Sequence, residues 1–369
     1  MTPLQALLVA RIRARGPMTF RAFMAEALYH PDHGYYTTGK PWRGEGDFTT
    51  APRYGDAFAL GIARFAARVK EAMGPGPFEV VEVGAGSGAL LEQLAPLLEP
   101  EGVRLRAVDH RRPPRLPAKV PWTASLRGLE VRGLVLSNEL FDALPVHRVT
   151  RTRDGLRELC VGEHDGRLVP QLGALSDAAI ERHLERFGPM PAEGQTVEVG
   201  LDALAMLREM AGALREGCVL TIDYGHSARE LQHHSPLGTL TAVRAHRLEP
   251  DPLVDPGELD LTAHVNFTAL TEAGKELGLQ ALAEVAQWEF LASTGALEHI
   301  AGLLQDVKGW EAGLAAKTLV TPGRMGEFRV HVQAKGLAPA VATRIAAAIA
   351  GQETLRRNAF QGGASSPPP

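Results

Sequence analysis

The segment that most constrains the fold is an apolar run that ends in glycines, Val80-Val81-Glu82-Val83-Gly84-Ala85-Gly86-Ser87-Gly88. A helix-like run starts directly after it, at Ala89. This order of strand, tight turn and helix is typical of nucleotide-binding α/β proteins. Glycines give the turn dihedral angles that a Cβ atom would forbid and let the backbone pass close to a ligand. The turn occurs in many α/β proteins, so neighbouring residues must identify the ligand.

Glu82 lies two residues before the first glycine. A carboxylate there can accept a hydrogen bond from an ammonium group or from water around it, and S-adenosylmethionine (SAM) carries both an ammonium and a sulfonium. A dinucleotide would place its pyrophosphate at the helix start, where a nearby carboxylate is unfavourable. The turn is also Gly-x-Gly-x-Gly rather than Gly-x-Gly-x-x-Gly. The first interpretation is a SAM-dependent methyltransferase, and the rival is a dinucleotide oxidoreductase.

Length and composition limit the domain number, the partners and the location of the protein. The 369 residues suffice for one large domain with insertions or for two domains, and the net charge of -4 does not favour nucleic-acid binding. Cys160 and Cys218 lie in apolar surroundings, which predicts packed, reduced thiols. No stretch is long and apolar enough to cross a membrane, so the default location is cytoplasmic. A homodimer is compatible with the sequence.

Strands and helices alternate through the middle of the chain, which predicts an α/β fold with a doubly wound, Rossmann-like sheet. N-terminal helices precede the sheet, and inserted β-rich substrate elements interrupt it. We expect strands at 78–83, 103–108, 134–136, 218–222, 281–288 and 328–333, and helices at 89–98, 202–214, 267–277, 296–316 and 339–350. Ligands on such a sheet bind beyond the carboxyl ends of the strands.

The predicted domain organisation has four parts. They are an N-terminal helical and lid segment, a methyltransferase domain, a C-terminal helix and a disordered tail, over 1–75, 76–336, 337–361 and 362–369. Two insertions are expected within the second part. The one at about 147–200 contains short strand pairs, and the one at about 226–262 has little periodicity and several prolines.

Asp109 ends the second predicted strand, one βα unit after the glycine turn. A carboxylate there can accept hydrogen bonds from both ribose hydroxyls. SAM and NAD both carry a ribose, so Asp109 does not choose between them. The alternative is an aspartate that only closes a turn or caps a helix. Ribose binding is favoured because position and residue type agree.

Three polar residues follow the next interior strand. Asn138 can bind the amino-acid end of SAM or the methyl acceptor, and Glu139 and Asp142 can hold a cationic acceptor. The structural alternative is that Asn138 caps a helix and Asp142 interacts with the helix dipole. For Asp142 the two explanations are equally good, whereas for Glu139 function is favoured.

Asp223 and His226 end another core strand and can supply acid-base chemistry or structural hydrogen bonds. His264 is open to the same two interpretations. The 13 histidines show no metal-ligand motif such as His-Glu-x-x-His. The sequence therefore predicts no metal site.

Several segments together resemble the MidA-type methyltransferases, a family that includes the mitochondrial complex I assembly factor. The resemblance covers roughly residues 15–335. Its segments are Gly46-Asp47-Phe48-Thr49-Thr50-Ala51-Pro52, the glycine turn, Asn138-Glu139-Leu140-Phe141-Asp142-Ala143-Leu144-Pro145-Val146, Asp223-Tyr224-Gly225-His226, Gly257-Glu258-Leu259-Asp260-Leu261-Thr262-Ala263-His264-Val265-Asn266-Phe267 and Met325-Gly326-Glu327-Phe328-Arg329-Val330.

The resemblance implies a class I methyltransferase fold with S-adenosyl-L-methionine as the cofactor. Asn138 and Glu139 would lie near the transferred methyl group. The other residues that would contact the cofactor are Glu82, Gly84, Gly86 and Gly88, together with a lid-like loop containing Gly46, Asp47, Thr49 and Thr50. This chain departs from the family at Arg53, where an acid is common, and has Gly-Ala-Gly-Ser-Gly where Gly-Pro-Gly-Arg-Gly is frequent.

The mitochondrial member is a protein arginine methyltransferase that acts on a complex I subunit, so the resemblance implies a protein substrate of that type. The pKa of an arginine side chain lies far above neutral pH, so the acceptor arrives charged. Glu139, with Asp142 or Asp223, would hold its guanidinium group and accept a proton. The alternatives are a non-catalytic SAM-binding assembly factor and a small-molecule methyltransferase.

Overall fold

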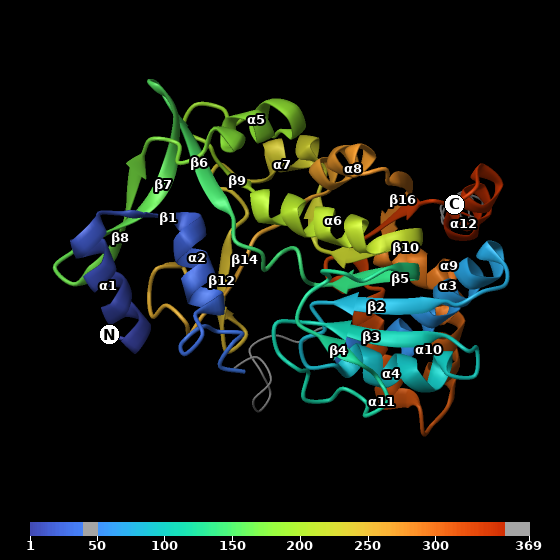
Figure 1. Cartoon of the computed structure of the whole chain (residues 1–369). Helices are drawn as coiled ribbons and strands as arrows, with labels where there is room; N and C mark the ends of the chain where they lie inside the picture. Colours follow the sequence, from blue (N-terminus) through green and yellow to red (C-terminus); the bar gives the residue numbers. More distant parts are fainter. Residues whose placement is uncertain (40–50, 351–369) are drawn as a thin grey trace, which may run out of the picture. The chain divides into compact units, whose positions relative to one another are not determined.

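The structure is a computed structural model that describes residues 1–39 and 51–350. The predicted lid residues Gly46, Asp47, Thr49 and Thr50 and the predicted disordered tail lie outside these ranges. The chain forms two compact units, and each is assembled from three separate stretches of sequence (Figure 1). Within the described ranges, the first unit holds 1–39, 139–209 and 223–276, and the second holds 51–138, 210–222 and 277–350.

The second unit is built on a seven-stranded sheet. Its strand order is β16 (Gln280–Ala286), β17 (Arg329–Lys335), β10 (Leu214–Asp223), β5 (Val131–Asn138), β2 (Glu79–Val83), β3 (Arg104–Val108) and β4 (Trp122–Thr123). The pairs from β10 to β4 are parallel, and β16 is antiparallel to β17. The chain first builds outward from β2 through β3 and then returns to β5 on the other side. This reversal confirms the predicted doubly wound α/β fold.

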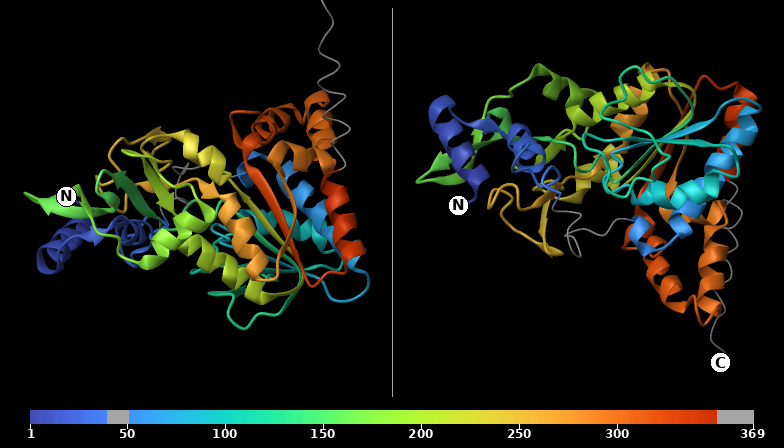
Figure 2. Two further views of the ribbon diagram at one scale, coloured as in Figure 1. Left: turned by 90° about the horizontal axis from the view of Figure 1, so that it is seen from above. Right: turned by 60° about the horizontal axis from the view of Figure 1, so that its bottom comes forward.

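Helices cover the sheet of the second unit. They are α3 (Ala57–Met73), α4 (Ala89–Leu98), α9 (Gln287–Ser293), α10 (Ala296–Gln305), α11 (Trp310–Ala316) and α12 (Pro339–Ala350), with short 3-10 turns at Ala51–Tyr54, Lys317–Leu319 and Met325–Glu327. All five residues of β2 are buried, as expected for a parallel strand covered on both faces. Phe65 of α3 meets Phe290 of α9 edge-on at 5.5 Å. Figure 2 shows α12 (red) beside α3 (light blue).

The first unit contains a five-stranded sheet whose pairs are all antiparallel. Its strands are β1 (Met18–Thr19), β6 (His147–Thr152), β7 (Gly155–His164), β8 (Arg167–Gly173) and β9 (Thr196–Val199). The helices α1 (Pro3–Arg15) and α2 (Phe20–Tyr29) contact it (Figure 1). Thr19 accepts a hydrogen bond from the backbone N–H of Ala22 and so caps the start of α2.

Further elements of the first unit lie between residues 178 and 276, partly within the two stretches that were predicted as insertions. They are α5 (Ala178–Phe187), β11 (Gly225–His226), α7 (Ala228–His234), β12 (Thr241–Arg244), β13 (Arg247–Leu248), β14 (Asp260–Thr262), β15 (Val265–Asn266) and α8 (Phe267–Glu276). The helix α6 (Leu201–Ala213) spans the point where the chain passes from the first unit to the second.

The residues 226–262 are more regular than the sequence predicted. Their elements are two to seven residues long, which is too short for a hydrophobic period to be visible. Residues 281–288 were predicted as one strand, but β16 ends at Ala286 and α9 begins at Gln287. The helix α5 was also missed, although Asp177 caps it by accepting a hydrogen bond from the N–H of Ala179.

Gly133 allows β5 to pair closely with β2. Its φ is 144°, and an added Cβ atom would overlap the carbonyl oxygen of Glu79. We therefore expect Gly133→Ala to lower the free energy of unfolding by at least about 2 kcal/mol, because both overpacking and strained backbone cost energy. Urea unfolding followed by circular dichroism measures this change.

The matched control is Gly212→Ala in α6, where an added Cβ meets nothing within 4 Å. It should raise stability by roughly 0.5–1 kcal/mol, because alanine loses less backbone entropy in a helix. Equal stability of wild type and Gly133→Ala would contradict the packing constraint.

Candidate functional site

The carboxyl ends of β2, β3 and β5 lie at one edge of the sheet because these strands are parallel neighbours. Gly84, Asp109 and Asn138 therefore end adjacent strands, as the sequence predicted. Strands are added to one side of β2 first and then, from β5 onward, to its other side. In open α/β sheets, ligands bind at such a switch point.

The glycine turn has the left-handed backbone dihedral angles that its sequence predicts. Gly84, Gly86 and Gly88 have φ values of 73°, 54° and 83°. A Cβ atom on Gly88 would lie 2.9 Å from the backbone nitrogen of Leu116. The turn is tied to the next strand, because the N–H of Gly84 donates to the carbonyl of Val108 at 2.8 Å.

Asp109 supports this turn directly. Its carboxylate accepts hydrogen bonds from the backbone N–H of Gly86 at 2.8 Å and of Arg111 at 3.2 Å, and it pairs with His110 Nδ1 at 2.8 Å. The turn-closing role considered from the sequence is therefore real. A carboxylate offers about four acceptor positions, so capacity for a ribose hydroxyl remains.

Glu82 is a buried carboxylate behind the turn, with 4% of its surface exposed. Its Oε2 atom has no hydrogen-bond partner within residues 1–39 and 51–350. Burial and the nearby Asp109 carboxylate raise its pKa well above the usual range. A buried acceptor in this position fits a ligand that brings a positive charge or a hydrogen-bond donor.

A second group of polar residues, in the first unit, begins one peptide bond after Asn138. Glu139 has a φ of 51°, which is rare for a residue with a side chain and stores strain on the order of 1–3 kcal/mol. Asp223 Oδ2 accepts hydrogen bonds from the N–H groups of Leu140, Phe141 and Asp142 at 3.2, 2.8 and 3.3 Å. Asp223 thus holds the turn that follows Glu139.

The carboxylates of this group perturb one another. Burial raises the pKa of Asp223, and the neighbouring Asp142 and Glu139 raise it further. Burial raises the pKa of Asp142 to about 6, although a hydrogen bond with Tyr224 opposes this change. Such shifted groups are typical of functional sites.

Tyrosines extend the group in a way that the sequence did not predict. Tyr36 donates a hydrogen bond to Asp260 Oδ1 at 2.8 Å, and its ring stacks on Tyr29 at 5.7 Å. Burial, Asp260 and then Asp142 raise the pKa of Tyr36. The available signal was that Tyr36 lies in an aromatic loop sequence and Asp260 in a segment that carries the family resemblance.

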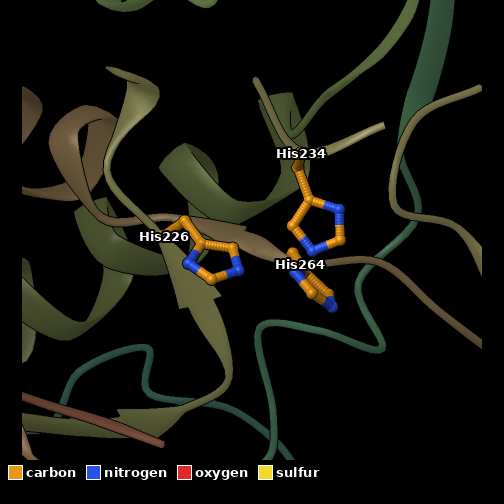
Figure 3. A group of neighbouring side chains, drawn as sticks. All are labelled: His226, His234 and His264. Carbon is orange, nitrogen blue, oxygen red and sulfur yellow. The ribbon is translucent and has the colours of Figure 1, made fainter. Parts of the chain in front are cut away.

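His226 and His264, which the sequence suggested for acid-base chemistry or structural hydrogen bonds, lie close to each other and to His234 (Figure 3). No sequence motif links these three residues. The separation of their positions along the chain explains why no metal-ligand pattern was visible.

Comparison with known proteins gives a consistent result. Residues 97–285 match a family described as putative S-adenosyl-L-methionine-dependent methyltransferases. A crystal structure of a Burkholderia thailandensis protein bound to S-adenosyl-homocysteine is 31% identical, with a TM-score of 0.83, and the match covers 92% of this chain and 94% of that one.

Curated relatives are named protein arginine methyltransferase NDUFAF7, mitochondrial. The Mus musculus protein is 28% identical over 90% of this chain and 84% of its own length. The Homo sapiens protein is 28% identical over 80% of this chain and 74% of its own length. These mitochondrial names contradict the cytoplasmic location predicted from the sequence, and that prediction is withdrawn. In the described part of the chain, no helix is both long and apolar enough to span a membrane.

Asp142 gives a prediction for the pH dependence of stability. Its folded pKa of about 6 lies above the value of about 3.9 in an unfolded chain, so folding favours its protonated form. Protonated Asp142 therefore contributes to the free energy of unfolding, on the order of 3 kcal/mol in total. This stabilisation is fully present below about pH 4 and is lost as the pH rises through 6. Asp142→Asn should therefore gain stability relative to wild type between pH 4 and 7.

Urea unfolding at several pH values measures the difference. Asp154→Asn, at an exposed position in the turn after β6, is the control and should follow the wild-type curve. Parallel curves for Asp142→Asn and wild type would contradict the role of Asp142.

Proposed function

Because this chain belongs to the family of putative S-adenosyl-L-methionine-dependent methyltransferases, we propose that it methylates an arginine side chain of a protein. The MidA-type resemblance and SAM as the cofactor are confirmed, and the dinucleotide alternative is set aside. The arginine acceptor is the finer step. It is supported by the names of the curated relatives and, above all, by the neighbouring carboxylates of Glu139, Asp142 and Asp223, of which the last two are buried.

The cofactor would be held by groups of the second unit. The glycine turn lets the backbone approach it, Asp109 would accept a hydrogen bond from a ribose hydroxyl, and the unused Oε2 of Glu82 would interact with the ammonium end or its water. Asn138 would orient the amino-acid end. When bound, SAM supplies a methyl group on a sulfonium, which is open to in-line displacement.

The acceptor would be held by the first unit. A guanidinium group would relieve the mutual repulsion of Glu139, Asp142 and Asp223, and ion pairs between guanidinium and carboxylates are planar and strongly oriented. Asp223 is a positioning residue, because its oxygens are occupied by backbone N–H groups. Glu139 and Asp142 would orient the guanidinium. A carboxylate with a pKa of about 6 is suited to accept the proton that the guanidinium must lose.

The direct test uses purified full-length protein, methyl-labelled SAM and an extract from cells that lack the protein. Label recovered as methylarginine in one protein band would support the proposal and identify the target, for which the resemblance implies a complex I subunit. Label found only in small molecules would overturn the arginine acceptor. SAM binding without label anywhere would favour a non-catalytic assembly factor.

Asp109→Ala should weaken SAM binding. It removes the acceptor for a ribose hydroxyl and the support of the Gly86 N–H, so the Kd should rise roughly 10- to 100-fold. Isothermal titration calorimetry with SAM measures the change. Asp154→Ala, at an exposed position, should bind like wild type. Unchanged affinity of folded Asp109→Ala would rule out this role.

Glu139→Gln should lower methyl transfer by roughly 10²- to 10⁴-fold while SAM affinity stays unchanged, because a carboxylate that orients the charged acceptor beside Asp142 is lost. Labelled methylarginine formed per unit time is the measurement. Glu185→Gln on the exposed side of α5 is the matched control. If folded Glu139→Gln retains full transfer, Glu139 is not a catalytic residue.

A further inference from the structure

The side chains of three histidines of the first unit lie close together, although the residues come from three different segments (Figure 3). His226 is in β11, His234 is the last residue of α7, and His264 directly precedes β15. One ring nitrogen from each lies within 4.8 Å of the other two. The ring centroids are 4.8 to 5.1 Å apart.

The backbone fixes this arrangement. β11 and β15 pair in parallel with Gly225 opposite Val265, which brings His226 next to His264. α7 starts directly after His226 with a capping box, in which Ser227 and Glu230 bond to each other's backbone N–H groups. His234, at the end of this two-turn helix, lies close to His226 and His264.

His264 carries an unused donor or acceptor. Its Nδ1 atom is buried and has no hydrogen-bond partner in the part of the chain that the structure describes. Its backbone N–H donates to Thr239 Oγ1 at 3.1 Å, and its ring lies edge-on to Tyr224 at 5.4 Å, so the side chain is held in place. A buried nitrogen without a hydrogen-bond partner is unfavourable, and a ligand that binds it would remove this cost.

Space for a small additional ligand is present beside this ring. A pocket of about 10 Å³ is bordered by His264, Thr239 and Glu198, among other residues. Such a volume accommodates about one water molecule.

We propose that His226, His234 and His264 bind one Zn²⁺ ion, with water as the fourth ligand. Imidazole suits zinc and its first-row neighbours, whereas Mg²⁺ and Ca²⁺ require oxygen ligands, and the cluster contains none. Zinc–nitrogen bonds of about 2.0–2.1 Å in a tetrahedron put the nitrogens about 3.4 Å apart. Small side-chain rotations bring the three rings from their present spacing to that distance.

The ion would act on the segment that carries the acidic group. His226 follows Asp223 and Tyr224 in the chain, and these two residues hold the turn after Glu139 and the Asp142 carboxylate. Zinc would tie this segment to α7 and to the segment before β15. Its effect on stability is independent of whether the protein methylates arginine.

The test uses tag-free full-length protein stripped with a chelator and then titrated with ZnCl₂ by calorimetry. We expect one zinc per chain and, at a concentration of 100 times the Kd, a rise in Tm of roughly 3–4 °C. Co²⁺ should replace zinc and give the visible absorption of a tetrahedral site. MgCl₂ should produce neither effect.

His234→Ala is the main variant, because His234 is exposed and its loss leaves the packing intact. It should raise the Kd for zinc on the order of 100-fold or more, since loss of even an outer partner costs 10- to 100-fold. His233→Ala, the adjacent exposed histidine, is the matched control and should bind like wild type. His226→Gln and His264→Gln should repeat the loss, with circular dichroism confirming their fold.

Two results would overturn the proposal. One is the absence of stoichiometric zinc binding by the wild-type chain. The other is binding that survives in His234→Ala and in both glutamine variants, which would place the zinc at other surface histidines.

Discussion

The parallel pairing of β5 between β2 and β10 is the constraint on which the rest of the structure depends. It requires glycine at positions 133 and 217, where a Cβ atom would collide with the neighbouring backbone. Because the three strands run in the same direction, their polar ends follow the buried core at one edge. This alignment places Gly84 and Asn138, and the parallel pairing of β3 with β2 places Asp109 at the same edge. The Asn138–Glu139 peptide bond connects these residues to the acidic residues of the first unit.

The carboxylates show how one fold maintains an unfavourable charge arrangement. Asp223 is surrounded by N–H groups of the turn after β5, so its cost of burial is partly offset within the protein. Asp142 has only a hydrogen bond with Tyr224 and its local backbone against the same cost. Asp223 therefore has more hydrogen bonds that stabilise its charged form than Asp142 has, and our proposal accordingly gives Asp223 a positioning role and Asp142 a chemical one.

The sequence predicted those elements whose structure depends on residues close together in the chain. The strand and turn at Glu82–Gly88 and the helix from Ala89 depend on neighbours a few residues away. The partnership of Tyr36 with Asp260 and the meeting of His226, His234 and His264 depend on pairings across long separations, such as that of β11 with β15. The short elements of 226–262 were missed for a related reason, since contacts rather than periodicity stabilise them.

The discontinuous build of both units has a consequence for the order of folding. The helices α1 and α2 belong to a unit whose last described element, α8, ends at Glu276. On a ribosome, the first helices therefore emerge long before their packing partners are made. Contacts between such distant segments are formed late, because closing long loops costs entropy. The apolar side of α2, which includes Phe20, Phe23 and Met24, therefore stays exposed while the chain is only partly folded. We expect synthesis of this protein to depend on chaperones that bind exposed hydrophobic helices.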